Sequence, residues 1–360
     1  MMITAGNGFI EQSDRYAFNN AGESLKKYIL LECGELAYNH GASKLRPYGS
    51  CFALTTVEKA RIPFVYHCFS VEKSNPEFLS IELNGANVEN QLRKIVSSGA
   101  RMDGLLNIAY SEYTEVTVQL PKKEEQDWIA KFFKQLDTLI TLHQRKYEKL
   151  VNIKKSMLDK MFPPNGASVP EIRFKGFTDP WEQRKLKELY FQLTERNTDL
   201  LPYQKTLSVA TMSFKTDGNG AADTSLANYK RLRTGDIAFE GHTSKEFRYG
   251  RFVLNDVGDG IMSPRFSALR PLHEMPINFW KYYIHYEPIM RKVLVNSTKA
   301  GTMMNELVIN DFLQGSILVP SMTEQQAIGR FFKQLDTLIT LHQREHIKPI
   351  LEVKRVKRNE

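Results

Sequence analysis

The chain contains little cysteine and no long hydrophobic run. Its 360 residues include three cysteines (Cys33, Cys51, Cys68), an odd number without metal-ligand spacing. This usage favours free thiols in a reducing cytosol over a disulfide framework. No apolar run is long enough to span a bilayer, and no basic patch followed by an apolar stretch suggests a secretory signal. We therefore expect a cytoplasmic protein without a membrane partner.

The common catalytic motifs are also missing. No P-loop pattern occurs, and the glycine pairs at Gly218-Asn219-Gly220 and Gly258-Asp259-Gly260 lack the third glycine of a dinucleotide site. There is no Asn/Asp-Pro-Pro-aromatic motif for amino-methyl transfer and no convincing nuclease carboxylate cluster. We therefore predict no catalytic residue, no metal site and no cofactor of its own, and we favour binding over catalysis.

An excess of positive charge indicates what the chain binds. The sequence has 49 Lys and Arg against 41 Asp and Glu, a net charge of +8. Such a balance favours a polyanionic partner. Because the basic residues are dispersed and no basic amphipathic helix stands out, nucleic acid is preferred to a membrane surface.

A string of fourteen residues occurs twice without change. Phe-Phe-Lys-Gln-Leu-Asp-Thr-Leu-Ile-Thr-Leu-His-Gln-Arg runs over 132–145 and again over 331–344, an offset of 331 − 132 = 199 residues. Repeats of single structural units recur every 20 to 50 residues. The longer period therefore indicates that a whole domain and its connector have been doubled.

The similarity extends upstream of each string. A proline and a Glu-Gln pair precede both copies, as expected for a strand that hands over to a helix. Gly34-Glu35-Leu36-Ala37-Tyr38 likewise matches Gly235-Asp236-Ile237-Ala238-Phe239. We predict an α+β fold of two mixed α/β domains, each followed by a long helix. The expected segments are a first domain over 1–121, a first helix over 122–162, a linker over 163–180, a second domain over 181–320, and a second helix with a basic tail over 321–360.

Both connectors show apolar residues spaced by four and three, the pattern of a coiled-coil seam. The seam positions expected to pair are Ile129, Phe133, Leu136, Ile140, Leu150, Ile328, Phe332, Leu335 and Ile339, interrupted by the polar His143 and Lys154. Helices are expected over 124–161 and about 324–347, packed antiparallel, with Pro349 ending the second. Two ordinary core-facing helices are the alternative.

Two loops have the character of a binding site. They follow the matched strands, cover 39–49 and 240–251, and mix cations with hydroxyl, amide and aromatic groups. Lys and Arg neutralise phosphates, and Arg and Asn can each read a base edge with two hydrogen bonds. A solvated hairpin tip is the alternative for any one residue. The candidate DNA-binding residues are Asn39, Lys44, Arg46, Tyr48, Arg101, Lys215, His242, Ser244, Lys245, Arg248, Tyr249, Arg251 and Lys299, with Arg265 as a further candidate.

The repeated features, together with the run Val169-Pro170-Glu171-Ile172-Arg173-Phe174 and the later Trp181-Glu182-Gln183-Arg184, resemble the specificity (S) subunit of type I restriction-modification systems, the HsdS family. The resemblance implies two target-recognition domains that read the halves of a bipartite double-stranded DNA site. It implies docking of modification subunits, two in number, which methylate adenine, and of restriction subunits. S-adenosylmethionine, ATP and Mg²⁺ are expected on those partners, and the chain itself is expected to be no enzyme.

The chain departs from the family pattern in its first half. About 30 residues from Trp181 to Val209 have no counterpart before the segment that aligns with Met1. We therefore expect a shortened first recognition domain. The other hypotheses are a stand-alone nuclease or DNA methyltransferase with an unrecognised motif, and a non-functional recombination cassette.

Overall fold

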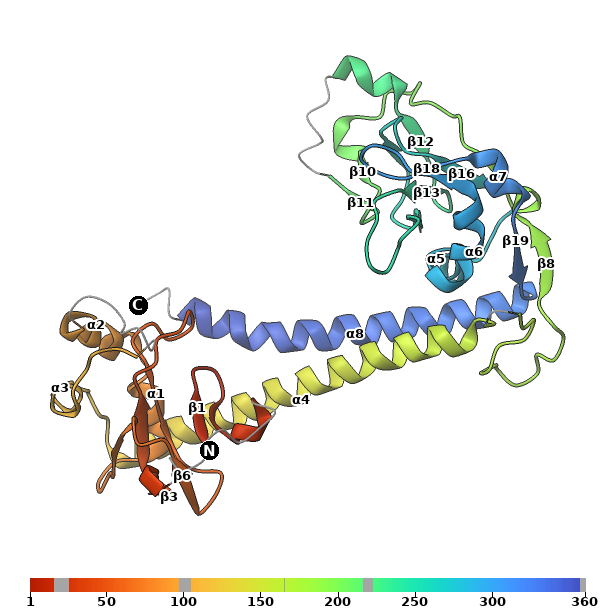
Figure 1. Cartoon of the computed structure of the whole chain (residues 1–360). Coiled ribbons are helices and arrows are strands. Elements are labelled where there is room, and N and C mark those ends of the chain that lie inside the picture. Colours follow the sequence, from red (N-terminus) through yellow and green to blue (C-terminus); the bar gives the residue numbers. More distant parts are fainter. Residues whose placement is uncertain (16–25, 97–104, 165, 216–222, 357–360) are drawn as a thin grey trace. The chain divides into compact units, whose positions relative to one another are not determined.

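The computed structural model describes residues 1–15, 26–96, 105–164, 166–215 and 223–356. The chain forms two compact units, Met1–Thr141 and Leu142–Glu360. The boundary between them lies inside one long helix, α4 (Lys123–Met161), which is drawn in yellow in Figure 1.

The first unit is built from short antiparallel strands covered by short helices. A three-stranded sheet has the order β5-β4-β7, β3 pairs with β6, and β1 and β2 form a hairpin. The elements are β1 (Met2–Thr4), β2 (Gly8–Ile10), η1 (Gln12–Asp14), β3 (Ile29–Glu32), β4 (Leu36–Asn39), β5 (Ser50–Ala53), β6 (Lys59–Ile62), β7 (His67–Phe69), α1 (Pro76–Glu82), α2 (Ala86–Ile95) and α3 (Tyr110–Thr114).

The second unit repeats this plan and adds strands. A four-stranded sheet has the order β14-β13-β16-β9, and β19 pairs with β8. The elements are β8 (Glu182–Lys185), η3 (Leu186–Glu188), β9 (Tyr190–Gln192), η4 (Tyr203–Lys205), β10 (Leu207–Ser208), β11 (Ser213–Phe214), η5 (Asp223–Asn228), β12 (Lys230–Leu232), β13 (Ile237–Glu240), β14 (Arg251–Leu254), β15 (Gly260–Met262), β16 (Ala268–Pro271), α5 (Ile277–Tyr283), α6 (Glu287–Ser297), β17 (Thr298–Lys299), β18 (Glu306–Leu307), α7 (Ile309–Gln314), β19 (Ser316–Val319) and α8 (Met322–Val356).

The order of strand pairing is the same in both units. The hairpin β1-β2 corresponds to β10-β11, and the pair β3-β6 corresponds to β12-β15. The central strand β4 pairs with β5 and β7 as β13 pairs with β14 and β16. β8 and β9 have no counterpart among the described residues of the first unit. The α+β class expected from the sequence is confirmed.

An aromatic cluster holds the long helices to the second unit. Phe162, at the end of α4, packs against Trp181, Phe279, Tyr283 and Phe332 with ring centroids 5.1 to 6.4 Å apart. All five side chains are buried. Large buried aromatic rings contribute strongly to a core, so this cluster fixes the end of α4 and the first turns of α8 on one core.

The end of α4 and the helix α8 run antiparallel, as the sequence predicts. His143 faces His342 with 3.4 Å between the Nδ1 atoms, and farther along Lys154 donates to Asp336 at 2.6 Å. Positions that increase along α4 therefore meet positions that decrease along α8. The two histidines occupy the same place in the duplicated string, so the helices cross there at equivalent points.

The burial of the predicted seam follows its spacing. Ile328, Phe332 and Leu335 are buried in the second unit, while Leu150 and Ile339 are half-buried. Ile129, Phe133, Leu136 and Ile140, in the part of α4 that belongs to the first unit, are half-buried as well. Their pairing with α8 stays a prediction. The bounds of α4 agree with the expected helix to within one residue.

The expected end of the second helix is wrong. Helix α8 continues through Pro349 to Val356 instead of ending near Ile347. A proline in a helix removes one backbone hydrogen bond and crowds the preceding turn, at a cost of about 3 kcal/mol. The residues on both sides of Pro349 keep the helical backbone, so this cost does not end α8.

The expected strand before each long helix forms in one half only. In the second unit β19 ends directly before Pro320 and pairs with β8 in the register Val319 to Glu182. The matching residues before Pro121 form no strand, so the expectation is wrong there. Strand assignment requires a partner, and no described segment of the first unit pairs with these residues.

Candidate nucleic-acid interface

The loop between β13 and β14 is built to hold a fixed shape at the surface. Ser244 closes a tight turn, since its N–H donates to the Phe247 carbonyl at 3.2 Å and its Oγ accepts from the Phe247 N–H at 3.0 Å. Phe247 is buried and anchors the turn, while Lys245 and Arg248 are exposed at its tip. The turn therefore presents two cations to solvent on a rigid support.

Gly250 closes the loop in a conformation that favours glycine. Its φ is 83°, and a Cβ at this position would lie 2.7 Å from the Glu240 carbonyl oxygen. Any larger residue would strain the backbone and push β13 and β14 apart.

A buried carboxylate connects the two ends of the loop. Glu240 accepts from His242 Nδ1 at 2.5 Å through one oxygen and from Arg251 Nε at 3.2 Å through the other. Arg251 also donates to the Ala210 carbonyl at 3.0 Å, and its guanidinium lies 5.1 Å from the Phe247 ring centre. Arg251 and His242 are therefore held by the protein, and Arg251 has fewer donors left for a ligand than Lys245 or Arg248.

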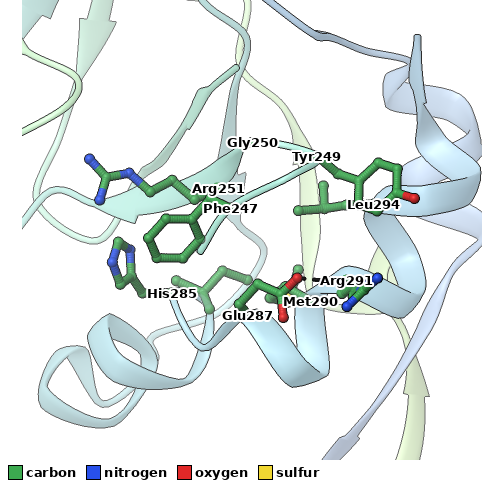
Figure 2. A pocket seen from close by; sticks show the side chains of 10 residues that line it. Phe247, Tyr249, Gly250, Arg251, His285, Glu287, Met290, Arg291 and Leu294 are labelled. Carbon is green, nitrogen blue, oxygen red and sulfur yellow. Dashed lines mark ion pairs between the residues drawn. The ribbon is translucent and has the colours of Figure 1, made fainter. Parts of the chain in front are cut away.

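The cavity beneath the loop is too small for a nucleotide. It has a volume of about 10 Å³ and is lined by Arg251, His285, Glu287 and Arg291 with neighbouring apolar side chains (Figure 2). This is room for roughly one water molecule. A ligand would therefore contact the outside of the loop, where Lys245 and Arg248 lie.

Two other predicted cations belong to segments that touch this loop. The backbone N–H of Asn305 donates to the Gly241 carbonyl at 2.9 Å, and its side chain donates to the Arg248 carbonyl at 3.2 Å. Asn305 lies in the connection of the β17-β18 hairpin, where Lys299 pairs with Glu306. The hairpin is bound so closely that a Cβ on Gly241 would lie 2.0 Å from the Asn305 carbonyl oxygen.

A hollow of about 240 Å³ opens beside this contact and is lined by Arg265, Thr302, Met303 and Asn305 among others. On the other side of the loop, Arg251 joins it to Ala210 in the β10-β11 hairpin, which Lys215 follows. Lys215 and Lys299 are both exposed. The fold thus brings together cations from three separate stretches of sequence.

The loop of the first unit, between β4 and β5, has the same backbone plan. Gly49 has φ of 84°, and its Cβ would lie 2.7 Å from the Asn39 carbonyl oxygen, as at Gly250. The N–H of Leu106 donates to the His40 carbonyl at 2.8 Å, in the manner of Asn305 and Gly241. The two loops are therefore equivalent in geometry as well as in sequence.

The side chains of the first loop are more committed to the fold. Asn39 donates to the Ile3 carbonyl at 3.1 Å and accepts from the Gly41 N–H at 2.9 Å. Arg46 donates to the Asn84 carbonyl at 2.6 Å, and the Tyr48 ring lies 5.6 Å from Arg93. Lys44 is exposed and forms no ion pair among the described residues. Arg101 lies outside the described residues.

Several structural residues escaped the sequence reasoning. Glu240 organises the second loop, and Arg270 bridges Asp236 at 2.8 Å and also Glu195. Burial raises the pKa of Asp236, although Arg270 opposes this. Asp236 lies in the matched Gly-Glu/Asp block, so the repeat marked its position but gave no sign of its partner.

A pH-dependent stability is expected from His285. This half-buried imidazole accepts or donates at the Phe252 carbonyl at 3.0 Å, packs against Phe247, and faces the charges of Arg251, Glu246 and Lys154. Burial lowers its pKa from the usual 6.5. Below that pH the unfolded chain binds a proton that the folded chain does not, so stability falls as the pH falls. His285→Gln should flatten the decrease in the unfolding free energy between about pH 7 and pH 5, and urea unfolding across this range measures it. An unchanged slope would contradict the assignment.

Comparisons with known proteins bear on the fold. No protein-family model matches the chain, and no curated protein matches it. A type I restriction-modification S subunit from M. genitalium matches with a TM-score of 0.51 at 12% identity, over 92% of this chain and 83% of that chain. The HsdS subunit from Thermoanaerobacter tengcongensis matches with a TM-score of 0.46 at 15% identity, over 91% and 79%. A chain from a structural study of assembly and conformational transition of the type I restriction-modification system has a TM-score of 0.46 at 16% identity, over 91% and 80%.

The M. genitalium likeness shows that the chain has the fold of a type I specificity subunit. Within the described residues, no helix combines the length and the apolar content needed to cross a membrane. No group of three or more His, Cys, Asp or Glu side chains in that part of the chain is placed to hold a metal ion.

Proposed function

We propose that the chain is the sequence-specific DNA-binding specificity subunit of a type I restriction-modification complex. Each unit would read one half of a bipartite double-stranded target, and the chain would dock modification subunits, two in number, and restriction subunits. The observation that supports this most directly is the surface loop that occurs twice with one backbone plan and carries exposed cations, on the fold of an S subunit.

The second unit offers the stronger candidate surface. Lys245 and Arg248 lie at a rigid tip, with Lys215 and Lys299 on adjoining segments. Ammonium groups serve well as phosphate contacts that position a protein on DNA, and an exposed arginine can take guanine through two hydrogen bonds. In the first unit Lys44 is the comparable exposed cation, since Arg46 is bound to Asn84.

The proposal assigns no catalytic step to this chain. S-adenosylmethionine, ATP and Mg²⁺ would belong to the partner subunits. The competing hypothesis is a nuclease or methyltransferase with an unrecognised motif. Purified chain mixed with DNA, Mg²⁺ and S-adenosylmethionine distinguishes them, because cleavage or methyl transfer without partners would favour the enzyme.

The loop itself can be tested by salt dependence. The double variant Lys245→Ala/Arg248→Ala should weaken binding to duplex DNA and lower the slope of log affinity against log salt by about two, since each lost phosphate contact contributes about 0.9. Fluorescence anisotropy at several salt concentrations measures it. Lys187→Ala/Lys333→Ala is a matched control, since it removes two exposed lysines elsewhere in the second unit. An equal loss in both double variants would mean that net charge, and not this loop, carries the binding.

Sequence reading requires the assembled complex. Co-expression with a type I modification subunit, followed by methylome sequencing, should give a bipartite methylated motif. Substitutions at Arg248 should then relax one position of the half-site read by the second unit, with a discrimination loss of about 1–3 kcal/mol. A motif without two parts would contradict the bipartite proposal.

A further inference from the structure

A segment of irregular chain covers one face of the second unit. We call residues 172–185 the strap. Arg173 in the strap makes a two-pronged ion pair with the buried Glu324, with both nitrogen–oxygen distances at 2.7 Å. Phe174 packs edge-to-face on Phe331 at 6.0 Å. The strap then ends as β8, which pairs with β19 over four residues.

The same face recurs in the first unit, because it lies within the duplicated sequence. At the offset of 199 residues, Glu125 corresponds to Glu324, Phe132 to Phe331, and residues 117–120 to β19. Here the face is uncovered. Phe132 is 54% exposed, and Leu120 is 45% exposed against 8% for its counterpart Val319. Glu125 is exposed where Glu324 is buried.

The polar groups of this face lack the partners that the strap supplies in the second unit. In the described part of the chain, Glu125 forms no ion pair and the backbone groups of residues 118–120 form no hydrogen bond. Only Thr117 is satisfied, by the side-chain amide of Gln91, which exchanges bonds of 2.8 and 2.9 Å with its carbonyl and N–H. Val118 already packs on the core of the first unit. The segment is therefore placed as a strand edge without a strand beside it.

An aromatic side chain specific to the first unit adds to the face. Trp128 lies one helical turn before Phe132 and is 77% exposed, and its counterpart in the second unit is Ala327. Exposed edges and apolar patches of this kind are sites where extended peptides add to a fold.

We propose that this face of the first unit, formed by residues 117–120, Glu125, Trp128 and Phe132, docks an extended segment of another polypeptide chain. The segment has the chemistry of the strap: an arginine for Glu125, an adjacent aromatic for Phe132, and a strand that runs antiparallel to residues 117–120. The second unit displays this occupant on the equivalent surface. The chain's own strap is not available for the first unit, because it is engaged with Glu324 and β19.

A labelled synthetic peptide of residues 169–186 tests the proposal on the full chain. Fluorescence anisotropy should show saturable binding. The variant Glu125→Arg should weaken it at least about tenfold, since it places like charges together. Glu124→Arg makes the same charge change at the neighbouring exposed position and should have little effect. Circular dichroism on both variants checks that the fold is kept.

A charge swap identifies the docking surface. A peptide with Arg173→Glu should bind the parent chain poorly and regain affinity for the Glu125→Arg chain. This rescue cannot arise at the second unit, where Glu324 is unchanged. Absence of binding up to about 100 μM peptide, or binding that ignores Glu125→Arg, would overturn the proposal.

The oligomeric state tells whether a second copy supplies the segment. Sedimentation of the chain alone should then show a dimer that Glu125→Arg dissociates and Glu124→Arg does not, which supports docking and identifies the donor. A dimer indifferent to both substitutions, together with a peptide that does not bind, counts against the face as a docking site.

Discussion

The variant Phe332→Ala should unfold the second unit far more easily than the parent protein, with a loss of about 3–5 kcal/mol in the free energy of unfolding. Phe332 is fully buried. Its ring lies 5.9 Å from Phe162 and 5.1 Å from Tyr282, so truncation would open a cavity between α4, α5 and α8. Urea unfolding followed by tryptophan fluorescence measures the loss, because Trp181 and Trp280 lie in the same core.

The duplicated string supplies the control for this variant. Phe132→Ala makes the same substitution within an identical local sequence, at a side chain that is 54% exposed. Surface substitutions usually change stability by no more than about 0.5 kcal/mol. Similar losses in the two variants would mean that the cost comes from helix propensity and not from the aromatic core.

The long helices were predictable because their signal is local and repeated. Apolar residues at spacings of four and three define α4 almost to the residue, and the buried Phe332 and Leu335 lie where that spacing places them. The end of α8 was not predictable in the same way. Proline imposes a cost of about 3 kcal/mol, but whether a helix ends there depends on what the alternative backbone would gain.

Strand formation was harder to predict because it depends on residues far away in sequence. Residues 117–120 and 316–319 precede the same proline and helix, yet only the second set is a strand. The difference is β8, which lies more than a hundred residues before β19. No property of either short segment carries that information.

The candidate interface was predictable at the level of the loop but not of the side chain. Matching blocks located both loops, and the structure shows the same positive φ at Gly49 and Gly250. Sequence alone did not separate the exposed Lys245 from Arg251, which Glu240 and Ala210 hold. Composition shows which residues can bind a phosphate, but tertiary hydrogen bonds decide which remain available.

Removal of the Glu324 carboxylate should also destabilise the second unit, by about 3 kcal/mol or more. Glu324 is 1% exposed and the Arg173 side chain 12% exposed, so the ion pair is largely withdrawn from water. Breaking a buried pair leaves one charge without a partner, and such losses amount to about 3–5 kcal/mol. Glu324→Ala measured by urea unfolding tests this, and Glu125→Ala at the exposed equivalent position is the control.

A double variant separates the cost of the orphaned charge from the worth of the pair. When both charges are replaced, as in Arg173→Met/Glu324→Leu, the buried guanidinium no longer needs a partner, so most of the lost stability should return. Arg173 also donates to the Asp179 carbonyl at 2.6 Å, and that bond is lost in the double variant, so recovery should be incomplete. If the double variant is as unstable as Glu324→Ala, the ion pair itself holds the strap on the second unit. Recovery would instead assign the attachment to β8 and the aromatic contacts, and the charges would serve to select which segment docks.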